Sequence, residues 1–525
     1  MAIQSTTLYI CIALFLIGCG SEKPENVESN SSKHFASESY KPPVFESDNR
    51  VEQIKKIAPR LQELIRAHAE SNHIPGIAYG IVVDNELVIA SSTGLIDLEG
   101  KVSATTKSAF RIASMSKSFT AMAIMKLRDE GKLSLSDPVS KFIPEMSTVT
   151  YLTDDSPIIN IKNLLTMTAG FPEDNPWGDR QLDEPDQMLI DLIANGLSFS
   201  NPPSYSYEYS NTGFAILGNI ISRVSGMPYQ EYINQNILLP LGMKETYWEY
   251  DSVPDSQLAL GYRWEDEQWK SEPLLHDGSY GAMGGLITTI EDFSKYVSFH
   301  LSAWPPRSDE DTGPVKRSTL REMHTPNFVR LYSNARDFSG NTCPTMVGYG
   351  YGLSISESCN RLKEVSHGGA LPGFGSNYKF YPEYGIGVMA FCNLTYTSPY
   401  PFSDIGKLLF DSLELQPRKL PVSDMLAERQ KQVVELIKGW DPELEAVLLA
   451  ENFYLDKSRD HRIAEIQEIL NQAGNIKEVL KIDPQNQLRG RFKMEAENGF
   501  INVFFTLTPE KDPKVQQLNV WLESN

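Results

Sequence analysis

The chain opens with a pattern that differs from the rest of the sequence. Ten apolar residues follow one another from Leu8 to Ile17. Such a run is too short for a helix to cross about 30 Å of hydrocarbon, but it has the length of a signal-peptide core. Residues 20–48 are polar, with few apolar positions before Val44, and such a composition buries too little surface to order a chain. We therefore expect a signal peptide over residues 1–19 and a flexible tether over 20–48.

From residue 49 onward the hydrophobic spacing becomes that of a folded domain. Apolar residues recur at helical intervals over 51–69, where Pro59 is expected near a break, and again over 116–130 and 214–224. Short or alternating apolar runs predict a β-hairpin and, late in the domain, consecutive antiparallel strands. These runs are 77–83 and 87–91 for the hairpin and 351–356, 362–366, 377–381 and 385–391 for the late strands, with a closing helix at 402–413. We predict an α/β (α+β) domain over 49–415, with a mixed or antiparallel sheet flanked by helices and a helical subdomain within 134–321.

A second folded unit is expected after the proline-containing segment 416–421. Helical spacing returns, and alternating strand patterns follow it. The predicted helices are 426–437, 443–451 and 459–473, and the predicted strands are 476–482, 488–496, 499–507 and 515–522. Helices followed by an antiparallel sheet predict a small C-terminal α+β domain over 421–525, to which the sequence gives no role.

Composition excludes some classes of function. The 525 residues are 41% hydrophobic and 22% charged, which is the composition of a folded protein rather than of a disordered one. The net charge is −20, without a basic cluster, and this opposes binding to nucleic acid. The five cysteines form no C-x-x-C pair and have no nearby histidines at ligand spacing, so no metal site is indicated.

A candidate nucleophile lies where a short strand-like run enters the 116–130 helix. Ser114 and Lys117 form an S-x-x-K pair, and residues three apart share one helix face, so the amine could accept the proton of the serine. The alternative is that Ser114 caps the helix and Lys117 is solvated. Ser376 and Lys379 have the same spacing, but on a strand the two side chains point to opposite faces, which excludes that pair.

Two further motifs recur along the chain. Tyr-x-Asn occurs at 209–211, 232–234 and 332–334, and His-x-Gly occurs at 276–278 and 367–369. With Phe110-Arg111-Ile112 before the S-x-x-K pair, the chain resembles the serine hydrolases of the class C β-lactamase and penicillin-binding protein type. The resemblance covers roughly residues 50–415 and selects Tyr209, which leads from a loop into a helix, and His367, which follows a strand. In 164–170, Met167 and Ala169 stand where histidine and serine are common in that family.

The resemblance implies a β-lactamase-like fold and an acyl-enzyme on Ser114. Lys117 and Tyr209 would share the proton transfers, each with its pKa brought down from the value in water, and the family needs no cofactor. The oxyanion hole would be formed by the backbone N–H groups of Ser114 and Ala370. The substrate would be held by Asn211, His367, Gly368 and Gly369. Because His367 stands where β-lactam-hydrolysing members usually have lysine, we expect an esterase or peptidase rather than an antibiotic hydrolase.

The end of the N-terminal apolar run indicates a location. Leu16-Ile17-Gly18-Cys19 resembles a bacterial lipoprotein cleavage box, although residues 1–7 lack the usual Lys or Arg. Cys19 would then carry lipid and hold the protein to the membrane of the cell envelope; plain secretion is the alternative. In that oxidising compartment Cys343 and Cys359 could form a disulfide, which the sequence leaves open, while Cys392 is expected to be a buried thiol.

The sequence as a whole therefore predicts an envelope-tethered serine hydrolase acting on a small ester, amide or peptide. Activity of the β-lactamase or D-Ala-D-Ala carboxypeptidase type is the alternative within the same fold. An inert binding or scaffold lipoprotein is the alternative of a different class, and the complete set of Ser114, Lys117, Tyr209 and His367 argues against it.

Overall fold

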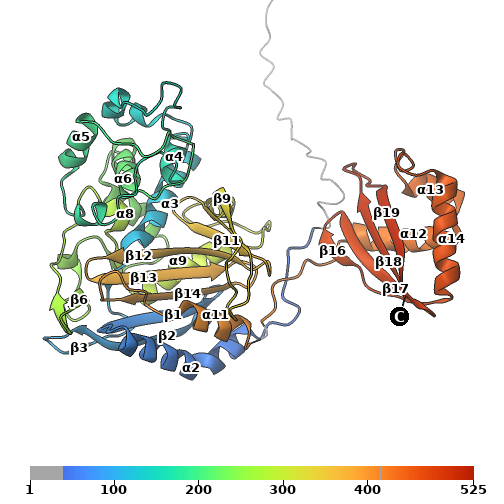
Figure 1. Cartoon of the computed structure of the whole chain (residues 1–525), viewed down its shortest axis with the longest axis horizontal. Coiled ribbons are helices and arrows are strands. Elements are labelled where there is room, and N and C mark those ends of the chain that lie inside the picture. Colours follow the sequence, from blue (N-terminus) through green and yellow to red (C-terminus); the bar gives the residue numbers. More distant parts are fainter. Residues whose placement is uncertain (1–39, 414, 525) are drawn as a thin grey trace, which may run out of the picture. The chain divides into compact units, whose positions relative to one another are not determined.

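The structure is a computed structural model that describes residues 40–413 and 415–524 (Figure 1). Two compact units are present, Lys41–Pro421 and a second one built on Val422–Asn525. The predicted signal peptide, the lipidation site Cys19 and most of the predicted tether lie outside the described residues. Within the described part of the chain, no helix is both long and apolar enough to cross a bilayer.

A nine-stranded antiparallel sheet forms the centre of the larger unit. Its strands follow the order β3-β2-β1-β14-β13-β12-β11-β10-β9, so the N-terminal hairpin pairs with the last strand of the unit. The strands are β1 (Gly76–Val83), β2 (Glu86–Asp97), β3 (Val102–Ser103), β9 (Asn327–Tyr332), β10 (Thr345–Tyr349), β11 (Ser354–Ser358), β12 (Lys363–Leu371), β13 (Phe374–Tyr381) and β14 (Ile386–Cys392). The architecture confirms the predicted sheet flanked by helices.

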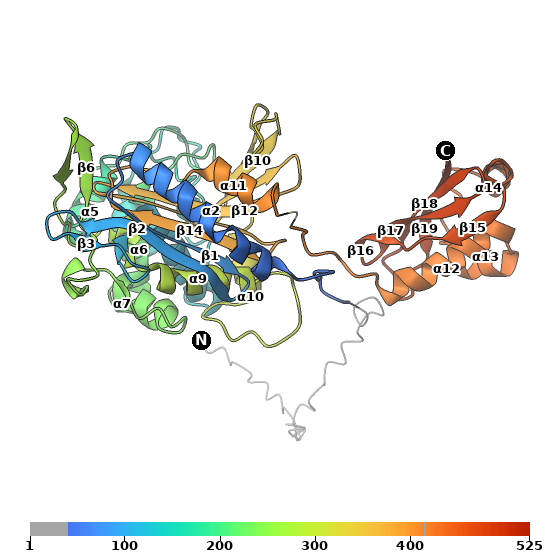
Figure 2. The ribbon, with the colours of Figure 1, turned by 90° about the horizontal axis from the view of Figure 1, so that it is seen from below.

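Helices cover both faces of this sheet (Figure 1 and Figure 2). The helices α2 (Arg50–Ser71) and α11 (Phe402–Phe410) bury their apolar stripes against Ile77 and Ile81 of β1, whereas α9 (Ile290–Ser302) lies on the opposite face with Ala78 and Val82. Side chains of consecutive strand residues point to opposite faces. The fully buried β1 therefore contributes to two hydrophobic clusters at once.

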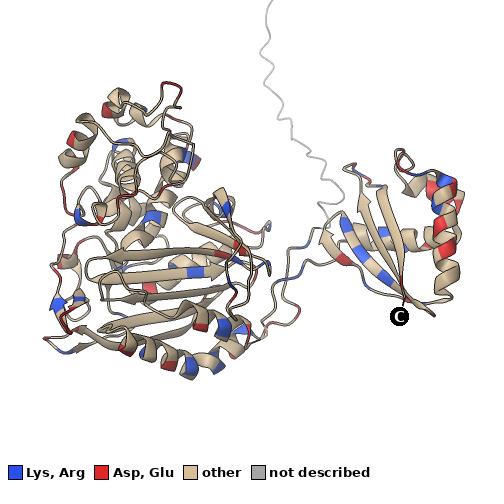
Figure 3. Cartoon of the chain, viewed as in Figure 1, with Lys and Arg blue, Asp and Glu red and all other residues tan. Residues whose placement is uncertain are grey.

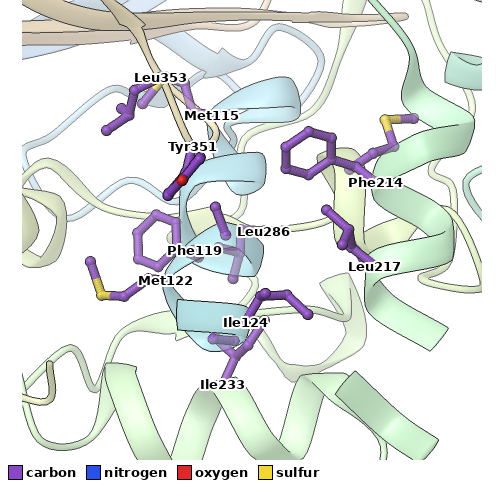
Figure 4. Packing of buried hydrophobic residues seen from close by; sticks show 14 of the residues in the cluster. Met115, Phe119, Met122, Ile124, Phe214, Leu217, Ile233, Leu286, Tyr351 and Leu353 are labelled. Carbon is purple, nitrogen blue, oxygen red and sulfur yellow. The ribbon is translucent and has the colours of Figure 1, made fainter. Parts of the chain in front are cut away.

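The remaining helices and short strands form a region between β2 and β9. Its helices are α3 (Ser116–Asp129), α4 (Ile161–Leu165), α5 (Asp186–Ala194), α6 (Asn211–Ser225), α7 (Tyr229–Ile233), α8 (Gly281–Gly284) and α10 (Arg317–Met323). Its strands are β4 (Phe110–Arg111), β5 (Thr246–Tyr247), β6 (Tyr262–Glu265), β7 (Gln268–Ser271) and β8 (Ile287–Thr288). Every residue of α3 from Ser116 to Met125 is buried. Figure 4 shows Phe119 and Ile124 of α3 packed among side chains that include Leu217, Leu286 and Leu353. This packing fixes the helix that carries Lys117.

The sequence patterns missed some features of this unit. No break occurs at Pro59, which lies inside a continuous α2, because Ile57 and Leu61 on either side of it are buried against the sheet. The strands β9 and β10 were not predicted. β9 is an edge strand with five of six residues exposed, so it has no buried face that would produce alternating apolar and polar residues.

The boundaries of the larger unit also differ from those predicted. Part of the expected tether belongs to the folded unit, since Val44 pairs with Lys419 and the Arg50 guanidinium lies 3.5 Å from the centre of the Phe45 ring. The unit therefore begins at Lys41 rather than at residue 49, and it includes the boundary segment 416–421, which the prediction placed after its end at residue 415.

The C-terminal unit consists of three helices and a five-stranded antiparallel sheet. The helices are α12 (Asp424–Gly439), α13 (Pro442–Leu448) and α14 (Arg459–Ala473). The strands are β15 (Ile476–Val479), β16 (Asp483–Asn486), β17 (Arg489–Ala496), β18 (Gly499–Leu507) and β19 (Val515–Ser524), of which β16 was not predicted. Along β17, Phe492 and Met494 enter the core, while Arg491 and Lys493 point away from it, and Figure 3 shows the basic positions along this sheet. This unit has its own hydrophobic core.

A disulfide joins Cys343 to Cys359, with the two Cα atoms 5.2 Å apart. The bond links the segment before β10 to the end of the hairpin β10–β11. Cys392 is a free thiol buried in β14, and burial raises its pKa to about 12, so it is unreactive at neutral pH.

We predict that a chain beginning at Lys41, unfolded without a reducing agent, will contain one free thiol and that the same chain after reduction will contain three. The reason is that Cys343 and Cys359 are joined and Cys392 is not. Titration with a thiol reagent under both conditions measures this directly. Three thiols before reduction would contradict the disulfide.

Candidate active site

Ser114 lies in a single 3₁₀ turn, Ala113–Met115, between β4 and α3. Ala113 adopts a left-handed conformation with φ of +51°, which is unusual for a residue with a side chain and turns the chain sharply just before the serine. Ser114 is 7% exposed, and the N-cap of α3 is Met115, so the serine does not cap the helix. The structure thus rules out the capping alternative.

Lys117 points from the first turn of α3 at Ser114. Its Nζ is fully buried and donates to three oxygens: Ser114 Oγ at 2.9 Å, Asn211 Oδ1 at 2.7 Å and the Met283 carbonyl at 2.9 Å. The amide and carbonyl oxygens can only accept hydrogen bonds, whereas a hydroxyl can also donate. When Lys117 is neutral, its two N–H bonds are therefore held by Asn211 and Met283, and its lone pair faces the hydroxyl of Ser114.

The pKa of Lys117 is lowered from 10.5 to about 7. Burial is the main cause, because an amine without water around it loses stability as an ammonium ion. The negative charges of Asp179 and Asp174 oppose this effect and keep the pKa from falling further. Near neutral pH a large fraction of Lys117 can therefore accept a proton.

Tyr209 lies on the other side of the same amine. Its ring centre is 4.9 Å from Lys117 Nζ, and its hydroxyl is hydrogen-bonded to the Ser114 side chain. Burial raises the pKa of Tyr209 well above 10, and the Ser114 bond only partly opposes this. Our expectation that both pKa values would be lowered is thus wrong for Tyr209, because burial disfavours the charged form of either group, and for a phenol the charged form is the deprotonated one.

Asn211 is the first residue of α6, where the chain leaves a loop. The Ser210 side chain caps this helix by accepting from Gly213 N, and Asp174 accepts from the N–H groups of Asn211 at 2.6 Å and Thr212 at 2.8 Å. The sequence reasoning identified Asn211 but not Asp174 or Asp179. Both carboxylates lie in the loop 172–184, which lacks hydrophobic periodicity, and the acidic residues themselves were the only signal.

One half of β12 forms the wall of the site that faces Ser114. β11 pairs with β12 only as far as Ser366, so the edge of β12 from His367 to Leu371 has no strand beside it there. A side chain on Gly369 would collide with the Ile112 carbonyl oxygen and with Ser376 Oγ, so only glycine allows β12 to lie this close to the turn that carries Ser114.

A cavity of about 650 Å³ opens between this edge and Ser114. The residues lining it include six of the predicted site residues, Ser114, Tyr209, His367, Gly368, Gly369 and Ala370. Lys117 and Asn211 lie behind Ser114, fully buried. The structure brings all the predicted catalytic and substrate-binding residues together in one place.

His367 is buried and hydrogen-bonded on both ring nitrogens. Nε2 is 2.9 Å from the Tyr349 hydroxyl and Nδ1 is 2.6 Å from the Gly368 carbonyl, which fits a neutral ring that donates from Nδ1 and accepts at Nε2. Burial and the Lys117 charge lower the pKa of His367 to about 4. At neutral pH the ring is therefore uncharged, and not partly charged as expected from an ordinary histidine.

The other copies of the motifs lie elsewhere. Tyr232 is buried in α7, Tyr332 is exposed on β9, and His276 is exposed and bonded to Glu249. On β13, Ser376 Oγ donates to the Ile112 carbonyl at 2.7 Å, while Lys379 forms an ion pair with Glu364 at 3.0 Å. Their separate partners confirm that these two residues do not form a second serine–lysine pair.

Comparison with known proteins agrees with this geometry. The Beta-lactamase family matches residues 61–409, more than half of the chain. Beta-lactamase-like protein 2 of Dictyostelium discoideum is 28% identical over 410 residues, which are 76% of this chain and 68% of that protein. Protein flp of Staphylococcus aureus strain MW2 is 27% identical over 340 residues, which are 64% of this chain and 63% of that protein.

Two solved structures show the same fold. A penicillin-binding protein homologue from Pyrococcus abyssi, described as octameric, aligns with a TM-score of 0.56 and 23% identity over 89% of this chain and 98% of its own. The penicillin-binding protein from Bacillus halodurans aligns with a TM-score of 0.50 and 24% identity over 67% of this chain and 98% of its own. The family match confirms the resemblance found in the sequence: the chain belongs to the beta-lactamase family, a family of the serine hydrolase type.

Proposed function

We propose that this protein is a serine hydrolase that cleaves an ester or amide through an acyl-enzyme on Ser114 and needs no cofactor. The observation that carries the proposal is the buried Lys117 amine, 2.9 Å from Ser114 Oγ, with its pKa lowered to about 7. A lysine in this state can serve as the general base for a serine at neutral pH.

The proposed reaction follows from the positions of these groups. Ser114 Oγ attacks the substrate carbonyl carbon as its proton passes to Lys117 Nζ, and the oxyanion lies between the backbone N–H groups of Ser114 and Ala370. When the bond to the leaving group breaks, the Tyr209 hydroxyl donates its proton to that group and recovers one from the Lys117 ammonium. Water then attacks the acyl carbon as its proton passes to Tyr209, which gives its own proton to Lys117. The Lys117 ammonium returns a proton to Ser114 Oγ as the acyl bond breaks, which releases the acid and restores Ser114.

The charge of the cavity favours substrates without a carboxylate. Among the described residues that line it, none is lysine or arginine, and Asp179 is the only carboxylic acid. His367 is neutral, and Lys379 on the neighbouring strand is already paired with Glu364. A β-lactam or a peptide ending in a carboxylate would find no cation here, which supports an esterase or peptidase over a β-lactamase or carboxypeptidase.

The proposed location is the bacterial cell envelope, with the protein held by a lipid on Cys19. This part rests on the apolar run Leu8–Ile17 and on the residues before Cys19. The proposed substrates are small esters, amides or peptides. The C-terminal unit would pack on the catalytic unit or contact a partner, and if the site proved inert this unit would be the place to look for function.

We predict that a fluorophosphonate probe will add once to the wild-type protein and not to Ser114→Ala. The labelling rate should rise as pH increases through about 7, because only neutral Lys117 accepts the serine proton. Lys117→Ala should lose about 10²–10⁴ in rate, the usual size of a general-base effect. Intact-mass analysis at a series of pH values measures all three. Labelling of Ser114→Ala, or a Lys117→Ala rate within tenfold of wild type, would refute the assignment.

We also predict that nitrocefin, which bears a carboxylate, will be hydrolysed much more slowly than a neutral aryl ester. His367→Lys should lower the KM for nitrocefin relative to that for the ester, because it adds a cation beside the substrate. Steady-state kinetics on both substrates with both proteins tests this. Equal turnover of the two substrates by the wild-type protein would show that a carboxylate is accepted without a cationic partner.

A further inference from the structure

A short loop lies against the start of α6 and contributes Asn175 and Asp179 to the lining of the cavity. Asp174 in this loop binds the first two N–H groups of the helix, as described above. Gly178 approaches so closely that a Cβ there would lie 2.8 Å from Asn211 Cβ. The loop is therefore fixed to the residue that contacts Lys117.

The same loop determines which way the Asn211 amide points. Asn211 Nδ2 donates to Asn175 Oδ1 at 2.9 Å and to Asp179 Oδ1 at 3.3 Å, and this leaves Oδ1 facing Lys117 Nζ at 2.7 Å. Rotation of the amide by 180° would place its NH₂ group against the lysine and its oxygen against two acceptors. The rotation is disfavoured both on the side of Lys117 and on the side of the loop, so Asn211 remains an acceptor for Lys117.

Asp179 is an unusual group to find in this position. It is 2% exposed, and its second oxygen accepts from the Tyr396 hydroxyl at 3.0 Å. Among the ion pairs of the described residues, none includes Asp179, so this buried carboxylate has no cation in contact with it. A buried charge without a direct partner is costly to maintain, and such groups are frequent at functional sites.

We infer that Asp179 is a positioning residue for Lys117: through Asn211 it orients the lysine amine toward Ser114, and its negative charge stabilises the ammonium that forms when Ser114 is acylated. This inference rests on the proposed function. Asp179 takes part in no proton transfer, since the serine proton moves only to Lys117 and then, by way of Tyr209, to the leaving group. In the series Asp179–Asn211–Lys117–Ser114, Asp179 thus has a role similar to that of the aspartate in a Ser-His-Asp triad, which orients the histidine base and stabilises its charged form.

The charges around Lys117 support a specific effect of Asp179. The titratable groups that face the lysine are Asp179 and Asp174 from the loop, Tyr209, and His367 from β12. Tyr209 and His367 are neutral near pH 7, because burial raises the pKa of the first and lowers that of the second. Burial raises the pKa of Asp179, and the Lys117 charge lowers it. Removal of the Asp179 charge should therefore lower the pKa of Lys117.

The test measures how the labelling rate of Ser114 by a fluorophosphonate depends on pH in the full chain. For Asp179→Asn we expect the midpoint of the rise to move to lower pH by about one unit and the rate at the plateau to fall by about tenfold or more. Asp179→Glu, which keeps the charge, should keep the midpoint near that of the wild type. The matched control is Asp155→Asn, which removes an exposed carboxylate in a loop and should change neither value.

A second variant tests the inference even if Asp179→Asn does not fold. Tyr396→Phe removes one hydrogen bond to Asp179 from a side chain that is 44% exposed, and it should move the midpoint in the same direction by a smaller amount. An unmoved midpoint in both variants would overturn the inference and leave Asp179 a purely structural residue. Absence of labelling in the wild-type protein would instead refute the proposed function, so the two failures are distinguishable.

Discussion

The burial of one amine is the constraint on which the rest of the site depends. Lys117 Nζ has no exposed surface and is surrounded by three oxygens, of which only Ser114 Oγ can give up a proton. Loss of water lowers the pKa of the amine, and the fixed acceptors decide where its lone pair points. Both effects require that the elements around Lys117 remain closed over it.

The fold closes over Lys117 because two helices and one strand of the sheet pack around α3 and the turn before it. The helix is buried over its first ten residues, α6 supplies Asn211 from its N-terminus, and α8 supplies the Met283 carbonyl. The sheet contributes the unpaired edge of β12, which Gly369 allows to approach the turn before α3. Since these elements come from distant parts of the sequence, the site forms only when the whole unit has folded.

The sequence allowed prediction of those parts of this arrangement that have a local signal. Ser114 and Lys117 share a helix face, and the resemblance to a known family distinguished Tyr209 and His367 from the other copies of their motifs. The edge strand β9 and the continuous helix through Pro59 could not be predicted, because one lacks a buried face and the other depends on packing against the sheet. Asp174 and Asp179 were missed for a similar reason. These two carboxylates matter because they lie close to Lys117 in space, and the residue spacing within the loop 172–184 does not indicate this proximity.

The same burial also separates the roles of two neighbouring groups. Lys117 is fully buried and Tyr209 is half-buried beside it, and this burial lowers the pKa of the lysine while it raises that of the tyrosine. The lysine thereby becomes able to accept a proton near pH 7, whereas the phenol holds its own proton and can act as a donor. A site with two such groups within reach of one serine has a base and an acid without any metal ion or histidine in either role. The neutral state of His367 fits this division, because a second cation next to Lys117 would oppose the ammonium that forms in the proposed reaction.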